Sequence, residues 1–427
     1  MNKTGSSLVH FSFTSERIIH FPAETSVRFT AATGRIIKIL CVLAFSRLCV
    51  KNSRVLDIPK TMRAVVYRGV NDLRLETVPV PRIGANELLV KVAICGVCPT
   101  DIKKIQHGTI APPRIFGHET AGTIMKLGAG NGKRGFKIGD RVALHHHVPC
   151  LDCHFCRHRA FAQCETYKRT GITAGFEPAG GGYAEFVRVM PFVLPGVVKI
   201  PARNSFEEGA MLEPVNTVLK AVKRLNFLPG DSVLVAGQGP IGLMFTKILR
   251  LHGINVLASD MLEARLQLAK KFGAKWTQLV SSPQSRVHSR GNRGAGLETV
   301  DCGPATLDCA VIAVPSDAVV TQAVRLVRGG GQILLFAHTK RAGHVEHSSA
   351  FGLDLASICL DEKDLIGSYS SDFTLQEEVA RLVFSRRFDV RQLITHRFPL
   401  DETAAAVALA ANPKPDSLKI FVSVLRQ

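Results

Sequence analysis

The pattern of apolar and polar positions changes character part-way along the chain. Between residues 62 and about 200, short stretches with strand-like alternation, such as ELLVKVAICGV and GGYAEFVRV, are separated by Gly and Pro turns. A helix is expected at about 206–225, and from the apolar strand 232–236 onward strands alternate with helices. Such alternation is typical of a parallel sheet covered on both faces. The sequence therefore predicts a mainly β domain followed by an α/β domain with a doubly wound parallel sheet.

The later segments complete this organisation. DLIGSYS at 364–370 is expected to be the last strand of the parallel sheet, and SLKIFVSV near the end is expected to return to the first domain. The polar stretch 281–305 is expected to form a long surface loop. The predicted domains are an N-terminal extension at 1–61, a β-rich domain at 62–212, the α/β domain at 213–367 and a returning C-terminal segment at 368–427.

The first 61 residues differ in character from the rest of the chain. They hold nine Lys or Arg and three Asp or Glu, a net charge of +6. Their most apolar stretch, 36–50, is interrupted by Lys38 and Arg47. It is too short and too charged for a membrane span, and it lies too far from the start for a typical signal peptide. We expect a targeting segment or upstream sequence translated from a start codon placed too early, and we favour the second.

The 427 residues are 46% hydrophobic, an ordinary globular composition, and carry a net charge of +19. A basic surface can attract nucleic acid or an anionic membrane, and it can equally help to steer an anionic cofactor. No run of Lys or Arg is interleaved with aromatic residues. We therefore expect neither nucleic acid nor a membrane as a partner.

A glycine-rich turn with the spacing of a dinucleotide-binding motif follows the strand 232–236. Gly237 allows a tight turn, Gly239 lets the backbone approach a pyrophosphate, and Gly242 lets the next helix pack on the strand. The N–H groups at the start of that helix face the anion. Because the strand, turn and helix stand in the required order, the sequence predicts a Rossmann cofactor site.

An acidic residue follows at the expected distance. Asp260 ends the next strand, 18 positions after Gly242, where a carboxylate can bind the ribose hydroxyls. Its charge would repel a 2′-phosphate, which favours NAD over NADP, although the nearby Arg265 could soften this preference. The predicted cofactor contacts are Gly237, Gly239, Pro240, Ile241, Gly242, Asp260 and Arg265.

Four cysteines crowd into fifteen positions with the pattern C-x2-C-x2-C-x7-C. They are Cys150, Cys153, Cys156 and Cys164. Four thiolates can close a tetrahedral shell around zinc and leave no open position, so a structural zinc site is predicted. An iron–sulfur cluster is the main alternative, since thiolates serve it too. This crowding also indicates a reduced, cytoplasmic compartment rather than a disulfide framework.

Five segments in a fixed order carry a family resemblance: CGVCPTD, FGHETAG, the four-cysteine loop, EPVN and GQGPIG. From Met62 to its end, the chain resembles the zinc-dependent medium-chain dehydrogenases, and within them the sorbitol and threonine dehydrogenase branch. The resemblance implies a GroES-like catalytic domain, a Rossmann domain that binds NAD, and a homo-oligomer, either a dimer or a tetramer. The strand GQILLFA would suit an interface built through the sheet edge.

The resemblance also assigns the catalytic zinc ligands. It places Cys98, not Cys95, at the position of the catalytic cysteine. His118 and Glu119 match the next ligand and its acidic neighbour, and Glu213 matches the further carboxylate of the polyol and threonine branch. The resemblance leaves open which of the two carboxylates touches the metal.

Further roles are implied by the resemblance. Thr100 matches the hydroxyl that binds substrate and begins proton relay, and Asp101 could orient the zinc histidine. The family often has histidine where this chain has Lys103, and lysine can carry protons only if its pKa is lowered. The implied activity is hydride transfer between NAD(H) and a secondary alcohol, either a polyol or a hydroxyl amino acid such as threonine.

Two alternatives stay open at this point. One is a zinc-free, NADPH-dependent reductase of activated double bonds, and the other is a nonenzymatic zinc protein that binds nucleic acid. The run His145, His146 and His147 could form a second metal site, but strand-end histidines near the cleft are the favoured interpretation. The remaining cysteines outside the extension, at 302, 309 and 359, are expected in the core.

Overall fold

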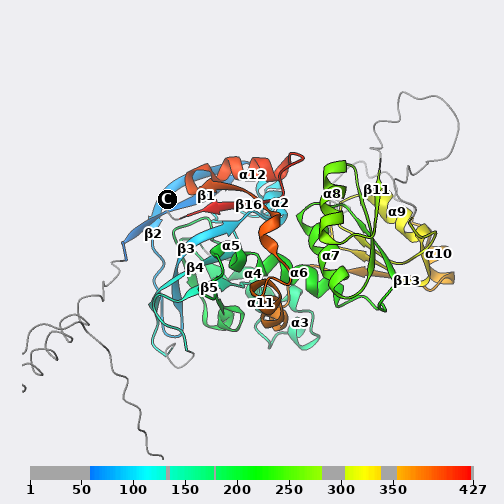
Figure 1. Ribbon diagram of the computed structural model, residues 1–427. Helices are drawn as coiled ribbons and strands as arrows, with labels where there is room; N and C mark the ends of the chain where they lie inside the picture. Colours follow the sequence, from blue (N-terminus) through cyan, green and yellow to red (C-terminus); the bar gives the residue numbers. More distant parts are fainter. Residues whose placement is uncertain (1–57, 131–134, 177–178, 281–302, 338–352, 425–427) are drawn as a thin grey trace, which may run out of the picture. The chain divides into compact units, whose positions relative to one another are not determined.

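The computed structural model describes residues 58–130, 135–176, 179–280, 303–337 and 353–424. Nearly all of the predicted extension and most of the predicted loop at 281–305 lie outside these residues. Within them, the chain contains a mainly antiparallel sheet and a six-stranded parallel sheet (Figure 1). The predicted fold class, a GroES-like β domain with a Rossmann-type α/β domain, is confirmed.

The larger sheet is mainly antiparallel and combines both ends of the described chain. Its main path runs β15-β16-β3-β4-β5-β8, and the short β6 and β7 join it through β3. In this sheet β16, from the SLKIFVSV segment, pairs antiparallel with β3 (Figure 1). The strands are β3 (Leu88–Gly96), β4 (Glu119–Leu127), β5 (Arg141–Leu144), β6 (Ile172–Thr173), β7 (Phe186–Val189), β8 (Val198–Lys199), β15 (Ile394–Pro399) and β16 (Lys419–Ser423).

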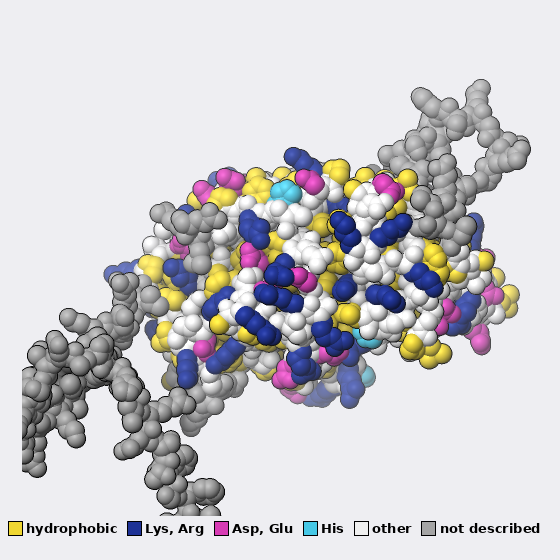
Figure 2. All heavy atoms as spheres, viewed as in Figure 1, with side chains coloured by type: hydrophobic (Ala, Val, Ile, Leu, Met, Phe, Trp, Pro, Cys, Tyr) yellow, Lys and Arg dark blue, Asp and Glu magenta, His cyan; other side chains and the backbone are white. Residues whose placement is uncertain are grey.

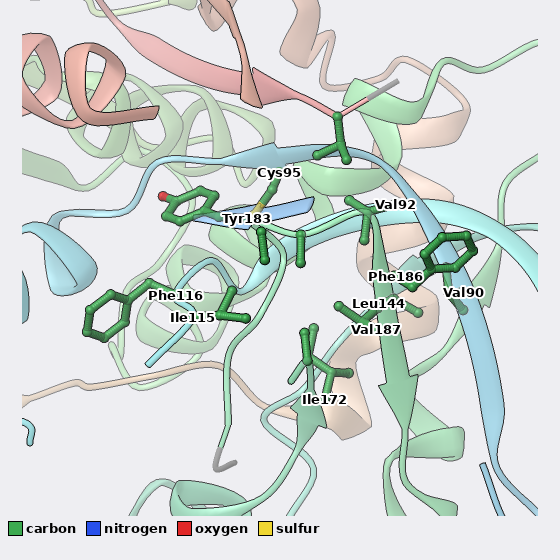
Figure 3. Packing of buried hydrophobic residues seen from close by; sticks show 14 of the residues in the cluster. Val90, Val92, Cys95, Ile115, Phe116, Leu144, Ile172, Tyr183, Phe186 and Val187 are labelled. Atoms are coloured by element: carbon green, nitrogen blue, oxygen red, sulfur yellow. The ribbon is translucent and has the colours of Figure 1, made fainter. Parts of the chain in front are cut away.

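An apolar core supports this sheet. A separate antiparallel hairpin, β1 (Thr61–Gly69) with β2 (Asp72–Pro79), contributes to the same core. Figure 3 shows inward side chains from different strands meeting there, among them Val90, Leu144 and Val187. Strand side chains alternate between the two faces of a sheet, and in β3 nearly every position on both faces is buried. The core therefore fixes the register that places residues at the strand ends.

The parallel sheet has the order β11-β10-β9-β12-β13-β14, with its switch point between β9 and β12. Ligands of such sheets bind outside the carboxyl ends of the strands at the switch point. The predicted strand 232–236 coincides with β9 (Ser232–Ala236). The other strands are β10 (Asn255–Asp260), β11 (Trp276–Leu279), β12 (Leu307–Ile312), β13 (Val327–Leu335) and β14 (Asp364–Gly367).

Helices link and cover the sheets. Those beside the parallel sheet include α7 (Pro240–Leu251), α8 (Glu263–Phe272), α9 (Asp317–Leu326) and α10 (Leu355–Leu360). The other α-helices of the described residues are α2 (Pro99–His107), α3 (His154–Arg157), α4 (Glu165–Arg169), α5 (Phe206–Ala210), α6 (Leu212–Val222), α11 (Gln376–Phe384) and α12 (Thr403–Ala411).

Three sequence predictions need correction. The helix expected at 206–225 is two helices, α5 and α6, because Pro214 has no N–H to bond the carbonyl of Ala210. GQILLFA falls in β13, which lies between β12 and β14, so β14 is the edge strand on that side of the sheet. Cys309 is buried as expected, but Cys359 is exposed because α10 buries none of its residues. Cys302 lies outside the described residues.

Candidate functional site

The first part of the candidate site is the start of α2. Cys98 is the N-cap residue, and Pro99 begins the helix because its ring fixes a helical φ and its missing N–H is not needed there. This start leaves the half-buried Cys98 at the helix end, with its Sγ 3.1 Å from Thr100 Oγ1. Asp101, in the first turn, is buried. The CGVCPTD segment therefore presents a thiol, a hydroxyl and a carboxylate from one helical turn.

The second part comes from β4. His118 and Glu119 stand at its start, next to the end of β3, where Glu119 pairs with Gly96. His118 Nδ1 lies 3.2 Å from the carboxylate of Asp101. Cys98, His118 and Glu119 form one group in which the possible ligand atoms all lie within 4.8 Å of one another. Sulfur, imidazole nitrogen and carboxylate oxygen suit zinc, and three protein ligands leave a position for substrate.

The electrostatics of this group favour a cation. Burial alone would lower the pKa of His118, but Asp101 and Cys98 raise it well above its ordinary value. A positive charge at this point is therefore stabilised by its anionic neighbours. In addition, an imidazole that donates from Nδ1 to Asp101 keeps Nε2 available as a metal ligand. The residues present fit a bound zinc ion.

A buried lysine that sequence reasoning did not find holds Glu119. Lys419, at the start of β16, places its Nζ 2.6 Å and 2.5 Å from the two carboxylate oxygens and 3.0 Å from the carbonyl of Val97. Burial would lower the pKa of Lys419, but Glu119 raises it above its ordinary value. The two residues are 300 positions apart. The sequence signal was a lone lysine at the start of an apolar strand, which is too common to single out.

Glu213 lies near this group but is not one of its three members. It is buried in the first turn of α6, and its Oε1 lies 3.1 Å from His147 Nδ1. The three histidines directly follow β5, so they are strand-end residues as expected. The rings of His146 and His147 lie 5.2 Å and 5.7 Å from the ring of His118.

The cysteine loop forms a separate candidate metal site. The sulfurs of Cys150, Cys153, Cys156 and Cys164 lie within 4.8 Å of one another. Two pairs are 3.5 Å and 3.9 Å apart, close to the roughly 3.8 Å expected around tetrahedral zinc with Zn–S near 2.3 Å. Backbone N–H groups of Asp152 and Cys153 lower the pKa of Cys150 to about 6, which favours the thiolate. These four residues fit a closed, structural zinc site.

The glycine-rich turn has the geometry required of a pyrophosphate site. Gly237 has a φ of +90°. A Cβ on Gly242 would lie 1.7 Å from the carbonyl oxygen of Gly237, so only glycine lets α7 approach β9 this closely. A Cβ on Gly239 would meet nothing within 4 Å. Pro240 and Ile241 open α7, whose first N–H groups face the same space.

Asp260 and Arg265 have different surroundings. Asp260 ends β10, and its two carboxylate oxygens accept hydrogen bonds from the backbone N–H groups of Gln238 (2.6 Å) and Leu262 (2.9 Å). Arg265 is buried, and it donates from Nη2 to the carbonyls of Lys414 (3.3 Å) and Ser417. The structure therefore gives Arg265 a packing role against the C-terminal segment that the sequence did not suggest.

Comparison with known proteins places this geometry in a family. The alcohol dehydrogenase GroES-like domain matches residues 84–202, and the zinc-binding dehydrogenase domain matches residues 240–385. A protein named Probable D-xylulose reductase A, from Aspergillus fumigatus, is 30% identical over 347 residues, covering 77% of this chain and 88% of that protein. The chain belongs to the zinc-binding alcohol dehydrogenase family.

Other members of the family support the same placement. Sorbitol dehydrogenase from Bacillus subtilis is 27% identical over 373 residues, covering 86% of this chain and 98% of that enzyme. The solved structure of an alcohol dehydrogenase from a Thermus species is 26% identical with a TM-score of 0.68, covering 85% of this chain and all of the other. The resemblance to the sorbitol branch is confirmed.

Membership of the zinc-binding dehydrogenases settles the enzyme class. The chain is a zinc- and nicotinamide-dependent oxidoreductase of the alcohol dehydrogenase type. This sets aside both the nonenzymatic nucleic-acid-binding alternative and an iron–sulfur cluster in the cysteine loop.

Among the described residues, no helix has the length and apolar character needed to cross a lipid bilayer. Lys and Arg side chains are spread over the face in Figure 2, with Asp and Glu among them, rather than forming one continuous stripe.

Proposed function

We propose that this dehydrogenase uses NAD to oxidise a secondary alcohol of the polyol type, and reduces the corresponding ketone in the reverse direction. The observation that carries the proposal is the group formed by Cys98, His118 and Glu119, whose possible ligand atoms lie within 4.8 Å of one another. The names of the relatives, sorbitol dehydrogenase and D-xylulose reductase, favour a polyol over a hydroxyl amino acid such as threonine.

In this proposal Cys98 and His118 hold the catalytic zinc together with a carboxylate of Glu119 or Glu213. Bound zinc supplies Lewis acidity that lowers the pKa of an alcohol. Asp101 accepts a hydrogen bond from His118 Nδ1 and so fixes the ring and its tautomer. Lys419 neutralises Glu119, which keeps that buried carboxylate in place whether or not it contacts the metal.

Proton transfer is assigned to α2. Thr100 Oγ1, beside Cys98, receives the proton of the substrate hydroxyl and passes its own hydroxyl proton on toward Lys103. Lys103 stands one helical turn further along the same face of α2. Burial lowers the pKa of Lys103, although Cys98 opposes this shift, and a lowered pKa is the condition that a lysine must meet to pass protons. We assign Lys103 as the outer relay group.

The remaining assignments concern the cofactor and the assembly. The pyrophosphate is assigned to the glycine turn and the start of α7, at Gly237, Gly239, Pro240, Ile241 and Gly242. The ribose is assigned to Asp260, whose charge favours NAD over NADP.

A homo-oligomer, dimeric or tetrameric, would form through the edge strand β14, where Leu365 is 37% exposed. The proposed compartment is the cytoplasm, because the described cysteines are all free thiols.

The zinc-free reductase of activated double bonds requires none of the three clustered residues, so their convergence argues against it. The test uses the full chain, metal analysis and a spectrophotometer. We expect about two zinc ions per chain and NADH formation from NAD with sorbitol or xylitol. An enzyme that oxidises no alcohol with NAD or NADP, but reduces an enone with NADPH, would overturn the proposal.

A further inference from the structure

His147 connects Glu213, one of the two carboxylates proposed for the zinc site, to a second polar network. It follows β5, and its Nδ1 lies 3.1 Å from Glu213 Oε1 and 2.8 Å from Ser371 Oγ. The side chains of His147 and Glu213 are only 13% and 5% exposed. Ser371 Oγ in turn lies 3.2 Å from His145 Nε2. These contacts bring together β5, α6 and the segment before α11.

The pairing decides what each nitrogen of His147 can do. Nδ1 of His147 pairs with Ser371 Oγ, a hydroxyl that can donate or accept, and Glu213 Oε1 faces the same nitrogen. These two side chains therefore occupy the Nδ1 side of the ring. Among the described residues, the structure gives Nε2 no hydrogen-bond partner. A hydroxyl group can pair with Nε2 in either protonation form, because it both donates and accepts.

The ring of His147 is held beside the metal site. It packs against His146 with ring centroids 3.7 Å apart, and against Tyr167 at 5.4 Å. Its edge-on contact with His118, at 5.7 Å, brings it next to the group formed by Cys98, His118 and Glu119. His146 Nδ1 is also buried without a hydrogen-bond partner among the described residues. This side of the site thus carries nitrogen atoms to which no described residue is hydrogen-bonded.

We propose that His147 is a specificity-determining residue, which offers Nε2 to a substrate hydroxyl next to the carbon being oxidised while Glu213 and Ser371 fix its ring. The inference rests on the proposed function and deepens it. A buried site built to hydrogen-bond a hydroxyl rejects an analogue without it, because the site's polar group would then be left unpaired. The substrate class selected is therefore alcohols with a neighbouring hydroxyl, not isolated secondary alcohols.

Three substitutions at His147 distinguish the roles of its two ring nitrogens. His147→Asn keeps a donor close to the Nδ1 position and removes Nε2, His147→Gln reaches toward Nε2, and His147→Phe keeps a flat ring with neither nitrogen. His158→Phe, at an exposed histidine on the cysteine loop, is the matched control. The measurement is kcat/KM for xylitol, 2,3-butanediol and 2-butanol with NAD, together with zinc per chain.

We expect His147→Asn and His147→Phe to lower kcat/KM for xylitol and 2,3-butanediol by about 10- to 100-fold relative to 2-butanol. His147→Gln should recover part of the preference for xylitol and 2,3-butanediol. The control, His158→Phe, should leave kcat/KM unchanged for all three alcohols. A second readout needs no turnover: calorimetric binding of xylitol to the NADH complex should weaken by a similar factor in His147→Asn.

The outcomes are distinguishable. An equal fall for all three alcohols, with lower thermal stability, would mean that His147 only supports the fold, and the inference would be wrong. An unchanged ratio with unchanged xylitol binding would also overturn it, while leaving the proposed dehydrogenase intact. If the wild-type protein oxidises no alcohol at all, the proposed function fails, and this inference fails with it.

Discussion

The cysteine loop and the alcohol site, the site around Cys98, His118 and Glu119, both offer ligands for a metal, but they are assembled differently. The loop takes all four sulfurs from residues 150–164. The alcohol site draws on the start of α2, the start of β4 and the start of α6, and its supporting residues Ser371 and Lys419 come from the C-terminal part of the chain. A local site depends on one loop, whereas an assembled site depends on the register of the whole sheet.

The largest expected effect is on the assembled site. In Cys98→Ala we expect zinc to fall from about two ions per chain to about one, and kcat/KM to fall by at least about 10³-fold, or about 4 kcal/mol of activation free energy. Thermal stability should change little, since Cys98 is half-buried at a helix end. Metal analysis and NADH formation measure both.

The control for this prediction is Cys95→Ala, three positions away in the buried strand β3. It should keep about two zinc ions and lose stability by about 1 kcal/mol through its missing sulfur contacts. If Cys95→Ala lost a zinc ion and Cys98→Ala did not, the two cysteines would have exchanged roles.

For the cysteine loop we expect the larger effect on stability and the smaller effect on catalysis. In Cys164→Ser we expect loss of the loop zinc and a fall in the free energy of unfolding on the order of several kcal/mol, with a smaller effect on kcat than Cys98→Ala. The reason is that Cys164 is fully buried within its own small cluster with Cys156 and Tyr167. Calorimetric melting and metal analysis provide the readouts. A melting temperature equal to that of wild type would show that the loop needs no metal.

The difference between the two sites also explains what the sequence could predict. The cysteine loop and the glycine turn were visible because their residues are close in sequence and their spacing is set by local geometry. The parts of the alcohol site that came from the resemblance, Cys98 and His118, do meet in the structure. Lys419 and His147 were missed as site residues because their roles arise from contacts across 300 and 66 positions, to Glu119 and Glu213.

Local sequence patterns also gave wrong predictions where the position in the tertiary structure determines strand pairing or burial. The apolar stretch GQILLFA suggested an edge strand, yet its strand β13 is paired on both sides. Cys359 has the residue type and setting of a core position, but it is exposed, as no residue of α10 is buried. Hydrophobicity reports how much a residue gains from burial, not whether a neighbour is present to bury it.

An intermediate effect is expected at the cofactor turn, which is local like the cysteine loop. Asp260→Asn removes the charge that would repel a 2′-phosphate while keeping one acceptor oxygen for the backbone N–H groups. We expect the preference for NAD over NADP in kcat/KM to fall about 10- to 100-fold, from the loss of one or two hydrogen bonds to a charged group. Asp231→Asn, at a similar backbone-capping aspartate before β9, should leave the preference unchanged. An unchanged preference in Asp260→Asn itself would remove Asp260 from the cofactor site.

The smallest expected effect concerns the scaffold on which the assembled site depends. Glu208 is buried in α5, which packs on β3, β4 and β5, and it accepts hydrogen bonds from Asn204, from the backbone of Ser205 and from Arg386. Burial would raise the pKa of Glu208, but Arg386, Ser205 and Asn204 together lower it below its ordinary value. The ionised form therefore stabilises the fold.

The sign of the pH dependence is set by that lowered pKa. Because the folded-state pKa lies below the unfolded value, the stabilisation is present above the unfolded pKa and is lost as the pH falls through the folded pKa. We expect Glu208→Gln to lower the free energy of unfolding by about 1–3 kcal/mol at pH 7, and this difference from wild type to shrink below about pH 4. Urea unfolding at several pH values tests it, with Glu377→Gln, at a side chain that is 89% exposed, as the control. A difference that grew on acidification would mean that Glu208 is protonated in the folded protein, and that the ion pair with Arg386 does not anchor α5.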